Sequence, residues 1–218
     1  MTNDALIFDI DGTLWNASAA TAKGWNLGLE SMGIDRRVTP EEIERVTGNP
    51  YERCVDILLP GLRERNSGLL DLLDSYEARV VASDGGNFYD GVIDGIFRLA
   101  GVCKVFIVSN CQEWYLDVFL RFSRLAPVLS GADCHGISGM AKNDMLSSMQ
   151  RDHALQHPVY IGDTAQDGRE AALAGISFIH VAWGFGEPED GAQRVHSFTE
   201  LLDYVGLRKE QKELNRSL

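Results

Sequence analysis

The chain has 218 residues, of which 44% are hydrophobic and 24% are charged, so it can form one domain, or one domain with an insertion, around a sizeable core. Its formal net charge of −12 argues against a nucleic-acid partner or a membrane surface, because both need clustered Lys and Arg. The sequence has no signal-peptide pattern, no apolar run of membrane-spanning length and no CxxC spacing among its four cysteines. We therefore expect a cytoplasmic protein with free thiols.

Four short apolar segments, separated by helical patterns, organise most of the chain. Each is bounded by turn signals, and its near-continuous apolar run predicts a buried strand. These strands are Ala5–Ile10, Cys103–Ser109, Pro158–Ile161 and Ser177–Ala182, with a weaker candidate near Val128–Ser130. Helical patterns fall over 90–100, 112–125 and 164–174. Strands that alternate with helices predict an α/β fold, in which a Rossmann-like parallel sheet core is covered on both faces.

One region breaks this alternation straight after the first strand. Residues 15–87 contain no good strand, but their apolar residues recur at helical spacing. The sequence "SDGGN" at 83–87 reads as a flexible linker that leads back to the sheet. We therefore expect an all-helical cap domain over 15–87, inserted into a core that is formed by residues 1–14 and 88–218.

Two patterns place helix starts inside this predicted cap. In "TPEE", Thr39 is the predicted N-cap and Glu42 completes a capping box, in which each residue's side chain binds the other's backbone N–H. In "NPYE", Asn49 and Glu52 repeat the same pattern. The cap is thus predicted to contain several short helices.

Polar side chains follow three of the predicted strands at the point where each strand ends. Asp9 and Asp11 end the first strand, Ser109 and Asn110 end the second, and Asp163 follows the third. In an open α/β sheet, ligands bind beyond the carboxyl ends of the strands. We therefore expect these residues to form a functional site at one edge of the sheet.

Four motifs occur in order along these elements. They are "DIDGT" at 9–13, "VSN" at 108–110, Lys142 in "SGMAKNDML" and "GDTAQD" at 162–167. Their types and order resemble the haloacid dehalogenase-like hydrolase superfamily, whose members carry DxDGT, a strand-end Ser or Thr, a lysine and GDxxxD. The closing "HVAWGFG" further resembles the phosphoglycolate-phosphatase-like subgroup, which has a helical cap after the first strand. The resemblance covers nearly the whole chain.

The resemblance implies a Mg²⁺-dependent phosphatase that hydrolyses a small phosphate monoester, such as phosphoglycolate. Asp9 would be the nucleophile that forms an aspartyl-phosphate, and Asp11 would be the general acid and base. Lys142 would neutralise charge on the phosphate. Asp9 and Asp163 would bind Mg²⁺ through carboxylates and Asp11 through its backbone carbonyl, while Asp167 would bind a metal-bound water or orient Lys142.

The same resemblance implies two further sets of contacts with a small phosphorylated metabolite as partner. The phosphate oxygens would meet four residues at the strand ends, namely Gly12, Thr13, Ser109 and Asn110. In the "TGNPYER" turn, Asn49 and Arg53 are candidates for contacts with the leaving group. We expect the protein to be a monomer or a homodimer.

Other functions stay open on the sequence alone. A 2-haloacid dehalogenase shares the nucleophile but has no need of a second aspartate as acid and base. A phosphonatase needs a cap lysine, and the only one is Lys23. A phosphosugar mutase keeps the same core residues. A phosphate-accepting receiver module, which is not an enzyme, lacks a long helical insertion, and a non-catalytic scaffold is a further alternative.

Overall fold

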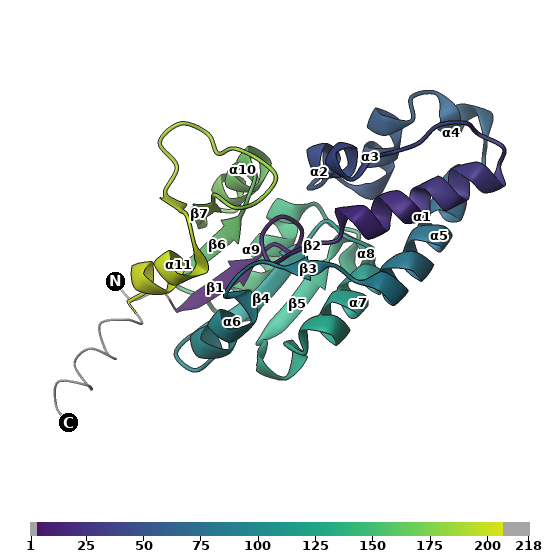
Figure 1. Cartoon of the computed structure of the whole chain (residues 1–218). Helices are drawn as coiled ribbons and strands as arrows, with labels where there is room; N and C mark the ends of the chain where they lie inside the picture. The colour runs from purple at the N-terminus through teal and green to yellow at the C-terminus, as the bar shows by residue number, and fades with distance from the viewer. Residues whose placement is uncertain (1–3, 207–218) are drawn as a thin grey trace.

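The protein is built around one parallel sheet. The computed structural model describes residues 4–206 and places six strands in the order β5-β4-β1-β6-β7-β8, with every neighbouring pair parallel (Figure 1). The strands are β1 (Ala5–Phe8), β4 (Lys104–Ser109), β5 (Gly131–Cys134), β6 (Pro158–Gly162), β7 (Ser177–Val181) and β8 (Arg194–Val195). The predicted α/β fold is therefore confirmed.

Helices cover both faces of the sheet because its strands are apolar on both faces. Leu6 and Phe8 of β1 pack on one side, whereas Ala5 and Ile7 pack on the other. The first face is covered by α6 (Val92–Ala100), α7 (Glu113–Ser123) and α11 (Phe198–Tyr204). The second face is covered by α9 (Lys142–Asp152) and α10 (Ala165–Leu173), and a short helix α8 (His135–Ser138) follows β5.

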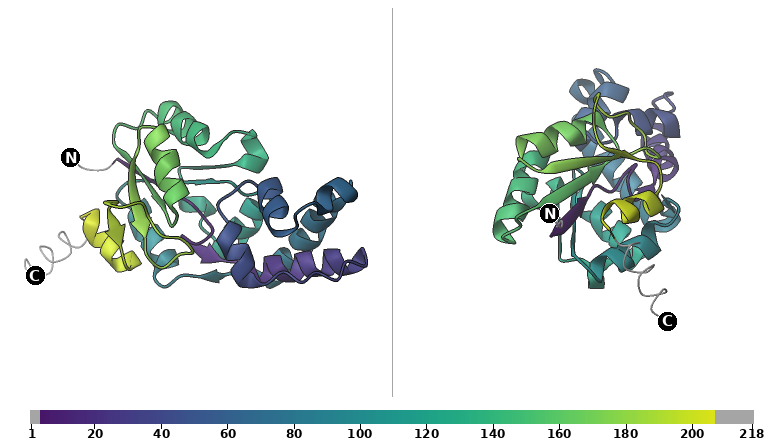
Figure 2. Two further views of the ribbon diagram at one scale, coloured as in Figure 1. Left: turned by 90° about the horizontal axis from the view of Figure 1, so that it is seen from above. Right: turned by 90° about the vertical axis from the view of Figure 1, so that its left-hand side faces the viewer.

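Five helices form a cap beyond one end of the sheet. They are α1 (Ser18–Ser31), α2 (Pro40–Val46), α3 (Tyr51–Leu58), α4 (Leu62–Arg65) and α5 (Leu69–Asp84). These purple and blue helices lie to one side of the sheet in the left view of Figure 2. They have a hydrophobic core of their own, to which Trp25, Ile43, Val55 and Leu73 contribute. In the part of the chain that the structure describes, no helix has the length and apolarity needed to cross a membrane.

A small antiparallel ribbon joins the cap to the sheet domain, and the sequence did not predict it. It pairs β2 (Trp15–Asn16) with β3 (Asn87–Phe88). Each strand has only two residues, so no alternation is visible in the sequence. The ribbon is held instead by Trp15, which is fully buried and whose ring centroid lies 5.8 Å from that of Phe88 and 5.4 Å from that of Phe119.

Three local predictions need correction. The capping box at Thr39 is present, but Asn49 does not cap α3; its side chain donates to the carbonyl of Val46 instead. The predicted linker at 83–87 is mostly ordered structure, because α5 continues to Asp84. The weak strand expected at Val128–Ser130 lies later, at β5, since a short 3₁₀ helix occupies residues 126–128.

Close contact between α1 and α5 gives the first testable expectation. A Cβ atom added at Gly24 of α1 would lie 2.6 Å from Cα of Glu77 in α5, which is too close for real atoms. Gly24→Ala is therefore expected to push the two helices apart and to lower the free energy of unfolding by about 1–3 kcal/mol. Chemical denaturation measures this loss, and Gly68→Ala is the control, because a Cβ there meets no atom within 4 Å. Equal stability of the two variants would contradict the close helix packing.

Candidate active site

The chain brings the predicted acidic residues together at the carboxyl edge of the sheet. Asp9 lies one residue beyond β1, and Asp163 follows β6 directly. Carboxylate oxygens of Asp9, Asp163 and Asp167 all lie within 4.8 Å of one another, and all three residues are buried. The parallel pairing of β1 with β6 produces this arrangement, because both strands end at the same edge.

A tight turn at Gly12 lets the first loop pass over Asp163. Gly12 has φ of +74°, and a Cβ atom there would lie 2.1 Å from Oδ2 of Asp163. Only glycine fits such a position. Thr13 comes next and donates its hydroxyl to Oδ1 of Asp163 at 3.2 Å, while the backbone N–H of Phe185 donates to Oδ2 at 2.7 Å. Thr13 thus orients a carboxylate in this structure.

One buried lysine lies between two of the carboxylates. The side chain of Lys142 is 1% exposed, and its Nζ lies 2.7 Å from Oδ1 of Asp167 and 3.2 Å from Oδ1 of Asp9. Burial acts to lower the pKa of Lys142, but the two aspartates outweigh it and raise that pKa well above its usual value. The lysine therefore carries a fixed positive charge beside Asp9.

Asp167 has its oxygens occupied by donors of the protein. Oδ1 accepts from Lys142 and, at 3.3 Å, from the hydroxyl of Tyr160. Oδ2 accepts from the hydroxyl and the backbone N–H of Thr164, the N-cap of α10. Burial acts to raise the pKa of Asp167, but Lys142 outweighs it and holds that pKa below its usual value. Of its two predicted roles, this geometry favours orienting Lys142.

Asp9 and Asp163 have the properties of metal ligands. Oδ1 of Asp9 is buried, meets no hydrogen-bond donor in good geometry and lies 3.2 Å from Nζ of Lys142, so one lysine shared with Asp167 compensates its charge only in part. Burial raises the pKa of Asp9 to about 6, and burial raises that of Asp163 as well. A cation between Asp9 and Asp163 would add positive charge beside both carboxylates and hold both groups ionised. The donors are hard oxygens, which suit Mg²⁺.

Asp11 lies apart from that cluster and contacts α7. Its Oδ1 accepts a hydrogen bond from the hydroxyl of Tyr115. Burial raises the pKa of Asp11 to about 7, while the Tyr115 hydroxyl and Lys142 act to lower it. A carboxyl group with a pKa near neutrality can both donate and accept a proton at neutral pH, which is the property of a general acid and base.

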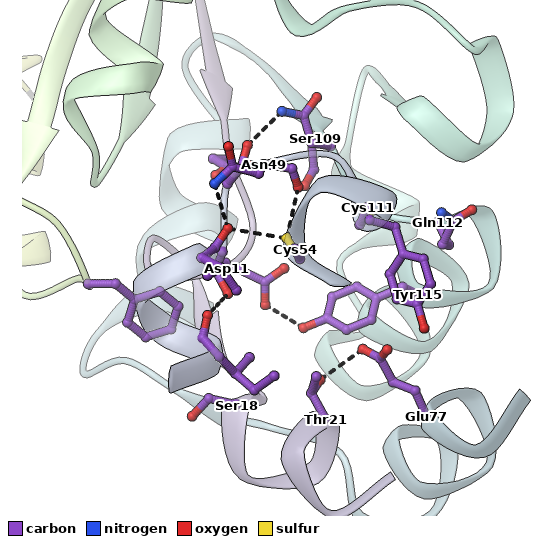
Figure 3. Close-up of a pocket in the computed structure, with 18 of the residues that line it drawn as sticks. Asp11, Ser18, Thr21, Asn49, Cys54, Glu77, Ser109, Cys111, Gln112 and Tyr115 are labelled. Carbon is purple, nitrogen blue, oxygen red and sulfur yellow. Dashed lines mark hydrogen bonds between the residues drawn. The ribbon is translucent and has the colours of Figure 1, made fainter. Parts of the chain in front are cut away.

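The cap closes over these residues and encloses a cavity of about 90 Å³ (Figure 3). Asp9, Asp11, Ser109 and Asn110 line it from the sheet domain. A cap turn descends into it, since the Asn110 side chain donates to the carbonyl of Gly48 at 2.8 Å. The two residues predicted to contact the leaving group lie in different places. Asn49 lines this cavity, whereas the exposed Arg53 lines a neighbouring groove between α3 and α8.

The sequence did not mark most of the cap lining of this cavity as part of a site, and two of the missed residues carry polar groups next to the predicted ones. Tyr115 contacts Asp11, but no motif marks it; only its place in the first turns of the helix after β4 points to the site. Glu77 lies on the buried face of α5 together with Leu69 and Leu73, four residues apart each time. A charged residue at an apolar position of a helix was the available signal for Glu77.

The chain is similar in sequence to known hydrolases. The family profile of the haloacid dehalogenase-like hydrolases matches residues 6–181. The chain is 28% identical to a phosphoglycolate phosphatase of Rhodobacter capsulatus, covering 92% of this chain and 96% of that protein. It is 24% identical to a 5'-nucleotidase of Pseudomonas aeruginosa, and this match covers 94% of this chain and 93% of that protein.

Among solved structures, a haloacid dehalogenase-like hydrolase from Streptococcus pneumoniae has the same fold. Its TM-score is 0.79 at 21% identity, and the match covers 93% of this chain and 98% of that one. The family profile spans both strands that carry aspartates, the lysine between them and the inserted helices. The chain therefore belongs to the haloacid dehalogenase-like hydrolase family.

Proposed function

We propose that this protein is a Mg²⁺-dependent phosphatase that hydrolyses a small phosphate monoester through an aspartyl-phosphate on Asp9. The observation that carries the proposal is the separation of roles between two neighbouring aspartates. Asp9 is held beside a buried lysine, whereas Asp11 is held by a tyrosine hydroxyl and has a pKa near neutrality. The names of the phosphatase and nucleotidase relatives support the same reaction class.

In the first half-reaction, an oxygen of the Asp9 carboxylate attacks phosphorus. The bond between phosphorus and the ester oxygen breaks, and Asp11 gives its proton to the departing alkoxide. Lys142 lies next to Asp9 and would stabilise the negative charge on the transferred phosphoryl group. The hydroxyl of Ser109 and the backbone amide of Asn110 would hold its other oxygens, whereas the predicted contact from Gly12 is not available, because its N–H donates to the carbonyl of Trp15 at 3.0 Å.

In the second half-reaction, water hydrolyses the aspartyl-phosphate. Asp11, now ionised, takes a proton from the water, whose oxygen attacks phosphorus and releases Asp9. Tyr115 keeps the Asp11 carboxyl turned toward the site in both steps. Inorganic phosphate is the product, and its release distinguishes a hydrolase from a mutase, which returns the phosphoryl group to a sugar.

Asp9 and Asp163 would hold Mg²⁺ through their carboxylates, and Asp11 through its backbone carbonyl. Mg²⁺ would supply positive charge beside the phosphate, in addition to that of Lys142. Thr13 and the backbone of Phe185 fix Asp163 for this role. A 2-haloacid dehalogenase would need no such cation. A phosphonatase would need a cap lysine at the site, but Lys23 pairs with Asp84 at 2.6 Å and does not line the cavity.

Removal of the metal gives a direct test. EDTA is expected to abolish phosphate release from p-nitrophenyl phosphate, and added Mg²⁺ is expected to restore it. Asp163→Ala should raise the Mg²⁺ concentration needed for half-maximal activity by about 10- to 100-fold, as loss of a metal contact typically does. Asp190→Ala, a change at an exposed carboxylate, is the control. Activity that is indifferent to EDTA would contradict the proposal.

A further inference from the structure

The part of the cavity that lies in the cap is aromatic and carries one carboxylate. It is lined by Thr21 and Trp25 of α1, Tyr51 of α3 and Glu77 of α5, which lie deeper in the cap than the phosphate-binding loops. Figure 3 shows Glu77 beside Thr21, on the side of the cavity away from Ser109. The alcohol part of a phosphate ester would therefore extend toward Glu77 when its phosphorus lies at Asp9.

Glu77 is a buried carboxyl group without a cationic partner among the described residues. It is 6% exposed, and its oxygens accept from the Thr21 hydroxyl at 2.9 Å and from Nε1 of Trp25 at 2.6 Å. Both donors are neutral. No ion pair reaches Glu77 among residues 4–206. Burial accordingly raises the pKa of Glu77 to about 7.

The surroundings of Glu77 add negative potential. Asp74, one turn earlier on α5, accepts from Nε1 of Trp114 at 2.9 Å and raises the pKa of Glu77 further. Within the described chain, no Lys, Arg or His lines the cavity. A leaving group with a carboxylate would thus meet Glu77 with no basic residue beside it, and burying an unpaired charge is costly.

Aromatic rings complete the surroundings. Trp25 and Tyr51 are packed edge to face, with ring centroids 5.8 Å apart, and Trp114 and Tyr115 line the same cavity from α7. The buried Tyr51 hydroxyl lies near Glu77 and acts to lower the pKa of that carboxyl group. A carboxylate among aromatic rings is the arrangement that attracts ammonium groups, because ring faces and carboxylate both favour a cation.

We propose that the preferred substrate is the phosphate monoester of a small amino alcohol, whose ammonium group pairs with Glu77 among the aromatic rings of the cap. This inference rests on the proposed phosphatase function and names its leaving group. The same carboxyl group disfavours phosphoglycolate, whose carboxylate Glu77 would repel in a cavity that no described basic residue lines.

Three esters of nearly equal size test the charge preference in the wild-type protein. They are 2-aminoethyl phosphate, 2-hydroxyethyl phosphate and carboxymethyl phosphate, which is phosphoglycolate. Because an ion pair in a buried site is strong, we expect kcat/KM for the aminoethyl ester to exceed that for the hydroxyethyl ester by about 10- to 100-fold. The carboxymethyl ester should be the poorest. Equal values, or a preference for the carboxymethyl ester, would overturn the proposal.

Glu77→Gln removes the charge and keeps the shape. The new amide can accept from Trp25 and donate to the Thr21 hydroxyl, so the fold is expected to survive. KM for 2-aminoethyl phosphate should rise by about 10- to 100-fold, and KM for the hydroxyethyl ester should rise much less, because a neutral hydroxyl loses only a hydrogen bond of modest strength. Tyr51→Phe is a second variant, which removes only the hydroxyl near Glu77 and should raise KM for the amino ester to a smaller extent. A uniform loss on both esters would mean that Glu77 is only structural.

Binding to the Asp9→Asn variant separates this inference from the proposed function. Calorimetry with the same esters needs no turnover and should give the order aminoethyl, hydroxyethyl, carboxymethyl. If that order holds but the wild type releases no phosphate from these esters or from p-nitrophenyl phosphate, the phosphatase proposal fails and the cation site stands. If the wild type hydrolyses them without this order in binding, the cation site fails and the phosphatase proposal stands.

Discussion

Asp9→Asn is expected to lower phosphate release by at least about 10⁴-fold with every phosphate ester, because the nucleophile is lost from both half-reactions. An asparagine has the shape of the aspartate, so the surrounding contacts can persist. The substitution also removes one negative charge from the buried cluster of Asp9 and Asp163. Burial raises the pKa values of both carboxyl groups. Stability should therefore not fall. Turnover of p-nitrophenyl phosphate and thermal unfolding measure the two effects.

The control for Asp9→Asn is a second change in the same cluster. Thr13→Val removes the hydroxyl that orients Asp163 but leaves the nucleophile in place. It should weaken Mg²⁺ binding and retain activity at high Mg²⁺ concentration. Full activity in Asp9→Asn would contradict the assignment of the nucleophile, whereas unfolding of that variant would contradict the expected persistence of the fold.

Asp11→Asn is expected to lower turnover of an alkyl phosphate by about 10²- to 10⁴-fold, the usual contribution of general acid and base catalysis. An alkoxide is strongly basic and needs a proton as it leaves, whereas p-nitrophenolate hardly does. Formation of the aspartyl-phosphate from p-nitrophenyl phosphate should therefore suffer less than its hydrolysis. The variant should accumulate phosphoenzyme, which is visible as a burst of p-nitrophenol in rapid-mixing experiments.

Tyr115→Phe is the matched change for Asp11. It removes the hydroxyl that donates to the Asp11 carboxylate and that acts to lower its pKa. We expect a smaller loss of activity than in Asp11→Asn and an upward shift of the pH at which Asp11 ionises. If Asp11→Asn lowered turnover of both substrates equally and showed no burst, Asp11 would be structural rather than an acid and base.

The sheet and its site were largely predictable because their signals are local. The predicted strands are near-continuous apolar runs, and three of them are followed by polar residues that the parallel arrangement carries to one edge. Asp9, Asp163 and Lys142 lie on different segments of the chain, and the structure brings their charged atoms within a few ångströms of Asp9. Position 12 requires glycine, because the turn there passes so close to Asp163 that a Cβ atom would not fit.

What the sequence did not reveal depends on contacts between distant segments. The two-residue strands of the β2–β3 ribbon form because Trp15 packs against α7, which no local pattern records. Asn49 has the residue type of a helix cap, but its side chain donates a hydrogen bond to the carbonyl of Val46 in the preceding helix instead. Glu77 becomes part of the cavity only because α1 and α5 pack closely at Gly24. Tertiary packing decides each of these cases.

The covalent intermediate on Asp9 is the central claim, and trapping it is the most direct test. Asp11→Asn protein mixed with ³²P-labelled p-nitrophenyl phosphate and Mg²⁺ is quenched in acid, digested and analysed by peptide mass spectrometry. We predict a phosphate label on the peptide that contains Asp9, released by hydroxylamine as acyl phosphates are, and absent from the Asp9→Asn, Asp11→Asn double variant. Phosphate release without labelled protein, or a label at another residue, would contradict the account.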